Sequence, residues 1–120
     1  GYSKDVIDKV IEKLIKNKLL DDEIFTKAYI NDKLNFTNVG KYKLISELTT
    51  KMKVDNSVVY NVLESYEEVW NDRIEKLINK YLKSNKKYRG NTLKNKLYIY
   101  LVNLGYDKDK VISVLNNYDF

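Results

Sequence analysis

The sequence predicts an all-α protein made of tandem three-helix repeats, which form an elongated, right-angled helical array of about seven helices. Apolar residues recur with helical period along almost the whole chain. The 120 residues include no Pro and only four Gly. Helices tolerate this scarcity of chain breakers, whereas sheets joined by tight turns would not. Two stretches with the same order of elements, roughly fifty residues apart, indicate a repeat array.

The first two helices are predicted on either side of the dipeptide Leu19-Leu20. Helix one spans about 3–18 and is capped by Ser3. Asp21 is the expected cap of helix two, because the acidic residues that follow it favour the positive end of a helix dipole. A loop is expected over 35–40. The side chains expected on the apolar faces of these helices are Val6, Ile7, Val10, Ile11, Leu14, Ile15, Phe25, Ala28 and Tyr29.

Five further helices are predicted in the rest of the chain. Helix three covers about 41–51, Asp55 caps helix four, and helix five covers about 67–84. After a basic loop over 85–91, helix six ends at Gly105, an expected left-handed cap, and Asp107 caps helix seven. The expected core positions are Leu44, Ile45, Leu48, Met52, Val59, Val62, Leu63, Tyr66, Ile74, Leu77, Ile78, Tyr81, Leu93, Leu97, Tyr100, Leu101, Leu104, Val111, Ile112 and Leu115. No helix is apolar all round, so stability must come from packing between helices.

The internal repeat pairs residues 40–63 with residues 97–115. Both stretches read as a helix, a short turn with an Asp cap, and a second apolar helix. The alignment needs a one-residue slip near Met52-Lys53. A chance match between two amphipathic helix pairs remains the alternative.

Composition excludes several classes of protein. Cys and His are both absent, which rules out disulfides, Cys/His zinc sites, a Cys nucleophile and His-based proton transfer. The carboxylates, Lys, Ser and Tyr residues form no convergent catalytic set, and no apolar stretch approaches the roughly 20 residues of a membrane span. We therefore expect a cytoplasmic, non-enzymatic binding protein with no cofactor, no metal site and no membrane contact. Because the chain starts at Gly1 without an initiator Met, we expect that part of the natural protein is missing.

Three groups of residues occur in an order that is typical of one family. Leu20-Asp21-Asp22 is followed by Phe25, Ala28 and Tyr29. Next come Gly40, Lys43, Leu44, Glu47 and Leu48, and near the C-terminus come Leu101 and Leu104-Gly105-Tyr106. In order and spacing they resemble the RecX family of recombination regulators. The chain departs from the family pattern at Lys51-Met52-Lys53-Val54, where a Gly is lacking, so we expect Lys53 to close that helix with some backbone strain.

The resemblance implies both an architecture and a partner. By this resemblance, the expected architecture is that of the RecX family, which consists of three tandem three-helix repeats. On that mapping, residues 1–20 are the last helix of a first repeat, 21–66 the second repeat and 67–120 the third. On the same mapping, we expect the first two helices of the first repeat to be missing from this chain. The family binds the RecA recombinase filament and inhibits its ATPase and recombination activity, so a RecA filament is the implied partner.

Positive charge is concentrated in the third repeat. Residues 76–106 hold eight basic residues and no acidic one, whereas residues 1–75 hold twelve basic and fourteen acidic. A basic face suits an acidic protein partner or, alternatively, single-stranded or duplex DNA, with an exposed Tyr stacking on a base. A solvated Lys-rich face, in a chain whose Lys, Asn, Ile and Tyr content fits AT-rich codons, is the other interpretation. The candidate binding residues are Lys76, Lys80, Lys83, Lys86, Lys87, Tyr88, Arg89, Lys94 and Lys96.

Overall fold

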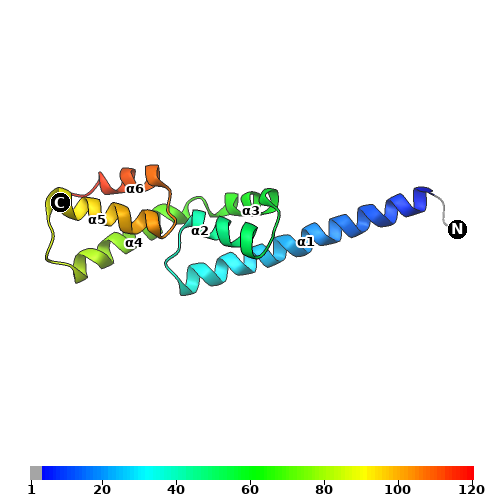
Figure 1. Ribbon diagram of the computed structural model, residues 1–120, viewed down its shortest axis with the longest axis horizontal. Coiled ribbons are helices and arrows are strands. Elements are labelled where there is room, and N and C mark those ends of the chain that lie inside the picture. The colour runs from blue at the N-terminus through cyan, green and yellow to red at the C-terminus, as the bar shows by residue number, and fades with distance from the viewer. Residues whose placement is uncertain (1–3) are drawn as a thin grey trace.

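The computed structural model describes residues 4–120 and contains only helices and their connections over that range. The helices are α1 (Lys4–Phe36), α2 (Lys41–Ser46), α3 (Asn56–Leu63), α4 (Val69–Ser84), α5 (Gly90–Asn103) and α6 (Lys108–Leu115). A π-helical turn (Glu47–Lys51) extends α2, and a 3₁₀ turn (Glu64–Tyr66) follows α3. The molecule measures 75 × 23 × 21 Å (Figure 1), so the predicted all-α, elongated architecture is confirmed.

The helices form two three-helix units that follow one another along the long axis (Figure 1). The C-terminal part of α1 packs with α2 and α3, and α4 packs with α5 and α6. Matching positions of the internal repeat are equally buried: Leu48 and Leu101 are both 0% exposed, as are Val59 and Val111. The pattern of the repeat is therefore present in three dimensions, while the repeat limits 1–20, 21–66 and 67–120 stay a prediction.

The predicted break between helices one and two is wrong, because α1 runs without interruption from Lys4 to Phe36. Asp21 is exposed within this helix and caps nothing, and this merger accounts for six α-helices where about seven were expected. Leu19-Leu20 favours a helix, and neither Gly nor Pro is present to end one. A residue that can cap a helix does not by itself interrupt one. The Ser3 cap lies outside the described residues.

Apolar side chains in the N-terminal part of α1 are exposed, although they were expected on a packed face. Most of this part of α1 extends beyond the two three-helix units (Figure 1), and no other element within residues 4–120 buries its apolar side chains. Burial on α1 begins only at Thr26 and Ile30, where α3 packs. The exposed large side chains are Val6, Ile7, Val10, Ile11, Leu14, Ile15, Leu19, Leu20, Ile24 and Phe25, and Ala28 is exposed as well.

Three expected core positions elsewhere are also exposed. Met52 is 44% exposed because it lies in the turn after the π-helical segment. Ile112 on α6 is exposed because that helix buries Val111, Val114 and Leu115, which leaves its neighbour at the edge of the packed face. Tyr100 is exposed at the rim of α5, where its ring contacts that of Tyr81 at 5.8 Å between centroids. Apolar periodicity identified the correct helix faces but not their edges.

The π-helical turn explains the one-residue slip in the repeat. The Val54 N–H donates to the Leu48 carbonyl six residues back, at 2.9 Å. In the second copy, the Tyr106 N–H donates to the Leu101 carbonyl five residues back, at 3.2 Å. A π-helical turn accommodates an extra residue inside a helix. It thereby lets Lys53, at a φ of 56°, close the helix in the strained left-handed conformation that was predicted for it.

The predicted N-caps Asp55 and Asp107, which begin the second helix of each copy of the repeat, are confirmed. The Asp55 carboxylate accepts the Ser57 N–H at 2.9 Å, and this bond, with the Ser57 hydroxyl, lowers the pKa of Asp55. The Asp107 carboxylate accepts the Asp109 N–H at 2.8 Å. Gly105, with a φ of 102°, is the left-handed residue between α5 and α6, as expected.

One polar cluster joins α1 to the π-helical turn that extends α2. The Tyr29 hydroxyl donates to Glu47 at 2.6 Å, and the Lys33 ammonium lies 3.7 Å from the same carboxylate. Desolvation, together with the nearby carboxylate, raises the pKa of Tyr29 to about 12. The hydroxyl therefore stays a donor across the whole physiological range.

We predict that Leu48→Ala and Leu101→Ala each lower the free energy of unfolding by roughly 2–5 kcal/mol, since both side chains are fully buried at matching positions. The measurement is urea denaturation followed by circular dichroism. Ile99→Ala, on the exposed side of α5, is the control and should change stability by less than about 0.5 kcal/mol. A wild-type midpoint for either Leu variant would contradict the assignment of that residue to the core.

Candidate functional site: the joint between the two units

The two three-helix units meet where their backbones touch directly. The Gly40 N–H donates to the Leu104 carbonyl and the Tyr42 N–H donates to the Gly105 carbonyl, both at 2.8 Å. A β-carbon on Gly40 would lie 2.5 Å from the backbone of Gly105 and Tyr106, too close for any side chain. Glycine is therefore required at position 40 by space rather than by conformation, because its φ of −95° suits any residue.

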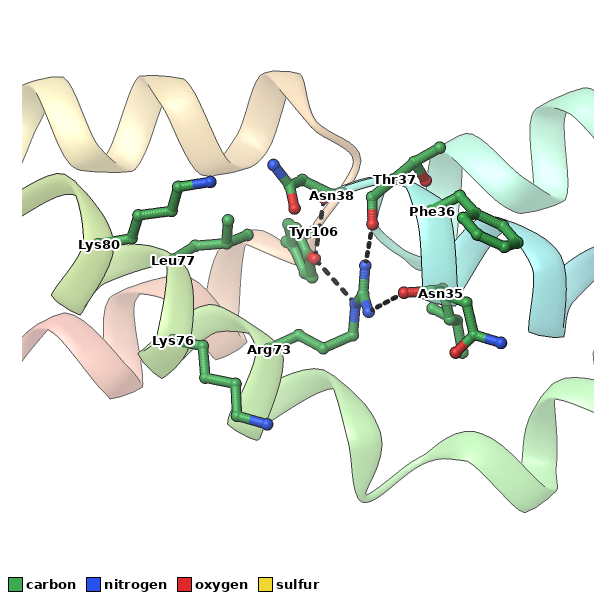
Figure 2. A pocket seen from close by; sticks show the side chains of 10 residues that line it. Asn35, Phe36, Thr37, Asn38, Arg73, Lys76, Leu77, Lys80 and Tyr106 are labelled. Carbon is green, nitrogen blue, oxygen red and sulfur yellow. Dashed lines mark hydrogen bonds between the residues drawn. The ribbon is translucent and has the colours of Figure 1, made fainter.

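Arg73, on α4, ties this joint to the end of α1 (Figure 2). Its guanidinium donates to the Leu34 carbonyl at 2.8 Å and to the Thr37 carbonyl at 2.7 Å, and its Nε donates to the Tyr106 hydroxyl at 3.3 Å. The Tyr106 hydroxyl in turn donates to the Asn38 carbonyl at 3.0 Å. Arg73 thus satisfies carbonyls at the negative end of the α1 dipole. Burial raises the pKa of Tyr106, against the opposing effect of the guanidinium.

Ionic contacts around Glu67 also join the two units. The Lys41 ammonium lies 2.8 Å from Glu67, and Lys110 lies 3.8 Å from the same carboxylate. The hydrogen bond from Lys41 lowers the pKa of Glu67. Tyr42 donates to Asp107 at 3.1 Å. Desolvation works to raise the pKa of Asp107, but the hydrogen bonds from Asp109 and Tyr42 outweigh it and lower the pKa.

A pocket of about 280 Å³ opens beside Arg73 (Figure 2). One wall comes from the end of α1 and the loop after it, and the other from α4. Phe36, the last residue of α1, is 83% exposed at its rim. The lining residues are Leu34, Asn35, Phe36, Thr37, Asn38, Arg73, Lys76, Leu77, Lys80 and Tyr106.

Most of this pocket was missed by the sequence analysis, which selected only Lys76 and Lys80 from it. A usable signal was present at Arg73, one of only two Arg residues in a chain rich in Lys. Arg presents several donors in a fixed plane, whereas Lys acts as a point charge. An Arg in a Lys-rich chain therefore indicates a position that needs several hydrogen bonds at once.

The predicted lysines on α4 are exposed, and their spacing places them on one face of the helix. Lys76, Lys80 and Lys83 lie on α4, and Lys76 pairs with Asp72 at 3.0 Å. Helix α4 ends at Ser84, so Lys86 and Lys87 belong to the following loop and do not continue this face.

The other predicted residues surround Tyr88. Its side chain is half-buried against the core, and its ring is approached by the Lys96 ammonium at 4.3 Å and the Lys87 ammonium at 5.5 Å from the centroid. Lys94 donates to Asn116 at 2.7 Å, and Arg89 is exposed just before α5. The nine candidates therefore all lie on the second unit, on α4, the loop after it and α5, and only Lys76 and Lys80 reach the pocket.

Over residues 4–120, no group of carboxylates is arranged to hold a metal ion. Within the same range no helix is long and apolar enough to cross a membrane.

The fold and the joint define an elongated helical-repeat protein with a basic surface, and comparisons with known proteins identify its family. No family model matches the chain. It is 37% identical over 120 residues to the regulatory protein RecX of Finegoldia magna, covering 93% of this chain and 57% of that protein. It is 30% identical over 119 residues to the regulatory protein RecX of Prosthecochloris aestuarii, covering 97% of this chain and 74% of that protein.

A solved structure agrees with these relatives. The crystal structure of RecX from Lactobacillus salivarius superposes with a TM-score of 0.75 at 20% identity, covering 96% of this chain and 75% of that one. The chain belongs to the RecX family of regulatory proteins. It spans between about half and three quarters of the length of these relatives.

Three glycine substitutions should separate close contact, which occurs at Gly40 and Gly105 of the joint, from backbone strain alone, which occurs at Gly90 outside it. Gly40→Ala introduces only a steric clash, and Gly90→Ala, at a φ of 62° in open space, introduces only strain. Gly105→Ala introduces both, because its β-carbon would lie 2.7 Å from Lys43. We expect losses of roughly 1–3 kcal/mol for Gly40→Ala, about 1–2 kcal/mol for Gly90→Ala and the largest loss for Gly105→Ala.

Chemical denaturation measures these losses, and small-angle X-ray scattering reports the radius of gyration, which is 20.0 Å for the Cα trace. The scattering should change for the variants at 40 and 105 and not for the variant at 90. Equal effects of Gly40→Ala and an exposed Asn→Ala substitution such as Asn95→Ala would show that the close contact is absent in solution.

Proposed function

We propose that this chain is a regulatory protein that binds the RecA recombinase filament and inhibits its ATPase and recombination activity. The observation that carries the proposal is the similarity to regulatory proteins named RecX over nearly the whole chain. The RecX resemblance supplies the partner and the direction of the effect.

The shape of the molecule supports a filamentous partner. Helical-repeat proteins present long, continuous surfaces because each repeat stacks only on its neighbours. This chain is 75 Å long and only about a third as wide, so it can contact several subunits of a polymer at once. The backbone hydrogen bonds and close contact at Gly40 and Gly105 hold the two units in this relative orientation.

Charge supports an acidic partner surface. The formal net charge is +5, and residues 76–106 carry eight basic side chains without an acidic one. A surface of one sign raises the rate of association with a partner of the opposite sign. The same observation favours a second candidate function, direct binding of nucleic acid by the basic surface.

The test of the proposal is the ATPase activity of RecA filaments on single-stranded DNA, measured as the chain is titrated in. We expect ATP hydrolysis to fall in proportion to the amount of chain bound. Because the chain spans only part of its relatives, the Prosthecochloris aestuarii RecX serves as a full-length comparison. Unchanged hydrolysis and no binding at any concentration, for both proteins, would refute the proposed function.

A quadruple variant separates the two candidate functions. Lys80, Lys83, Lys87 and Arg89 are all exposed, so replacing them together by Ser should shift stability by only about 0.5 kcal/mol each. Fluorescence anisotropy then compares bare single-stranded DNA with RecA-coated DNA. Weaker binding only to coated DNA favours the filament. Weaker binding to both favours nucleic acid, with the slope of log affinity against log salt flattened by about 0.7 for each lost phosphate contact. Wild-type binding in both assays would exclude this surface.

A further inference from the structure

We propose that the pocket at the joint binds a short acidic segment of the partner that carries an apolar side chain next to its carboxylates. This inference rests on the proposed function, because it assigns one docking point on the recombinase filament. Three features of the pocket support it: an excess of positive charge, an exposed aromatic anchor, and a small volume.

The positive charge in the pocket is not neutralised by the surrounding residues. Arg73 makes its three hydrogen bonds to two carbonyls and a hydroxyl, all uncharged groups. Lys80 has no ion-pair partner among residues 4–120, and Lys76 has only the exposed carboxylate of Asp72. Two carboxylates from a partner would balance the two remaining charges, on Arg73 and Lys80. Such a pair, shielded inside a pocket, is worth more than an exposed one.

The aromatic anchor is Phe36. It is the most exposed of the large apolar side chains over residues 4–120, at 83%, and it lies at the rim of the pocket (Figure 2). Its ring is not packed against the buried core. A partner that covered the ring would therefore gain the free energy of burying a whole phenyl group. Aromatic residues in this position commonly dominate the binding energy of an interface.

The size and walls of the pocket favour a peptide over a nucleic acid strand. At about 280 Å³ it holds one or two side chains, and Leu34 and Leu77 give it apolar walls. The lysines that would continue a track for phosphates, Lys83 and Lys87, do not line it. The amide side chains of Asn35 and Asn38 lie at its edge and can pair with the backbone of a bound segment.

The test compares binding of matched variants to RecA-coated single-stranded DNA. Phe36→Ser and Lys80→Glu should each raise Kd roughly tenfold, the effect expected for a residue at the centre of an interface. Their controls are Ile99→Ser and Lys27→Glu, which remove an exposed apolar side chain and an exposed ammonium that do not line the pocket, and these should change Kd less than about twofold. Circular dichroism confirms that all four variants fold.

Photo-cross-linking then identifies the occupant. With p-benzoylphenylalanine in place of Phe36, illumination of the bound complex should attach the chain to a carboxylate-rich peptide of the recombinase. A cross-link to DNA or to a peptide without carboxylates overturns the inference. Equal binding by Phe36→Ser, Lys80→Glu and their controls overturns it too, while leaving the proposed function standing. No binding by the wild-type chain removes both.

Discussion

The contact between Gly40 and Gly105 is the constraint on which the rest of the structure depends. It brings the start of α2 against the turn after α5, two segments separated by more than sixty residues. Any side chain at position 40 would push these backbones apart. The orientation of the basic second unit relative to α1, the hydrogen bonds of Arg73 and the shape of the pocket all follow from this one approach.

The forces inside each unit differ from those at the joint. Within a unit, buried aliphatic side chains supply most of the stability, as the matching Leu48 and Leu101 illustrate. At the joint, backbone hydrogen bonds, the Arg73 guanidinium and the Glu67 carboxylate add directional contacts to an apolar core that includes residues of both units. Hydrogen bonds need defined distances and angles, whereas apolar contacts tolerate small slides. A polar joint therefore fixes an angle between two units that apolar packing alone would hold less strictly.

Local patterns in the sequence predicted most of the second unit and much of the first. Asp55 and Asp107 cap helices because capping depends on a residue and its immediate neighbours. Gly105 adopts its left-handed conformation for a similarly local reason. The continuity of α1 was not predictable from a cap-forming Asp21, since the same residue suits an exposed helix position. The pocket could not be predicted, because it brings Phe36 and Arg73 together across the joint. These residues are far apart in the sequence, and no local pattern indicates that they lie close in space.

The protein contains a single Trp, and its position gives the joint an optical reporter. Trp70, near the start of α4, is 1% exposed, and its indole lies edge-to-face with the ring of Tyr106 at 6.4 Å between centroids. Tyr106 is the residue whose hydroxyl bonds Arg73 and the Asn38 carbonyl. Both rings belong to the second unit, but the Tyr106 hydroxyl reaches the Asn38 carbonyl of the first, so we expect the indole emission to change when the two units separate. Opening of the joint can therefore be followed by the intrinsic fluorescence of the unlabelled chain, even when both units stay helical and circular dichroism does not change.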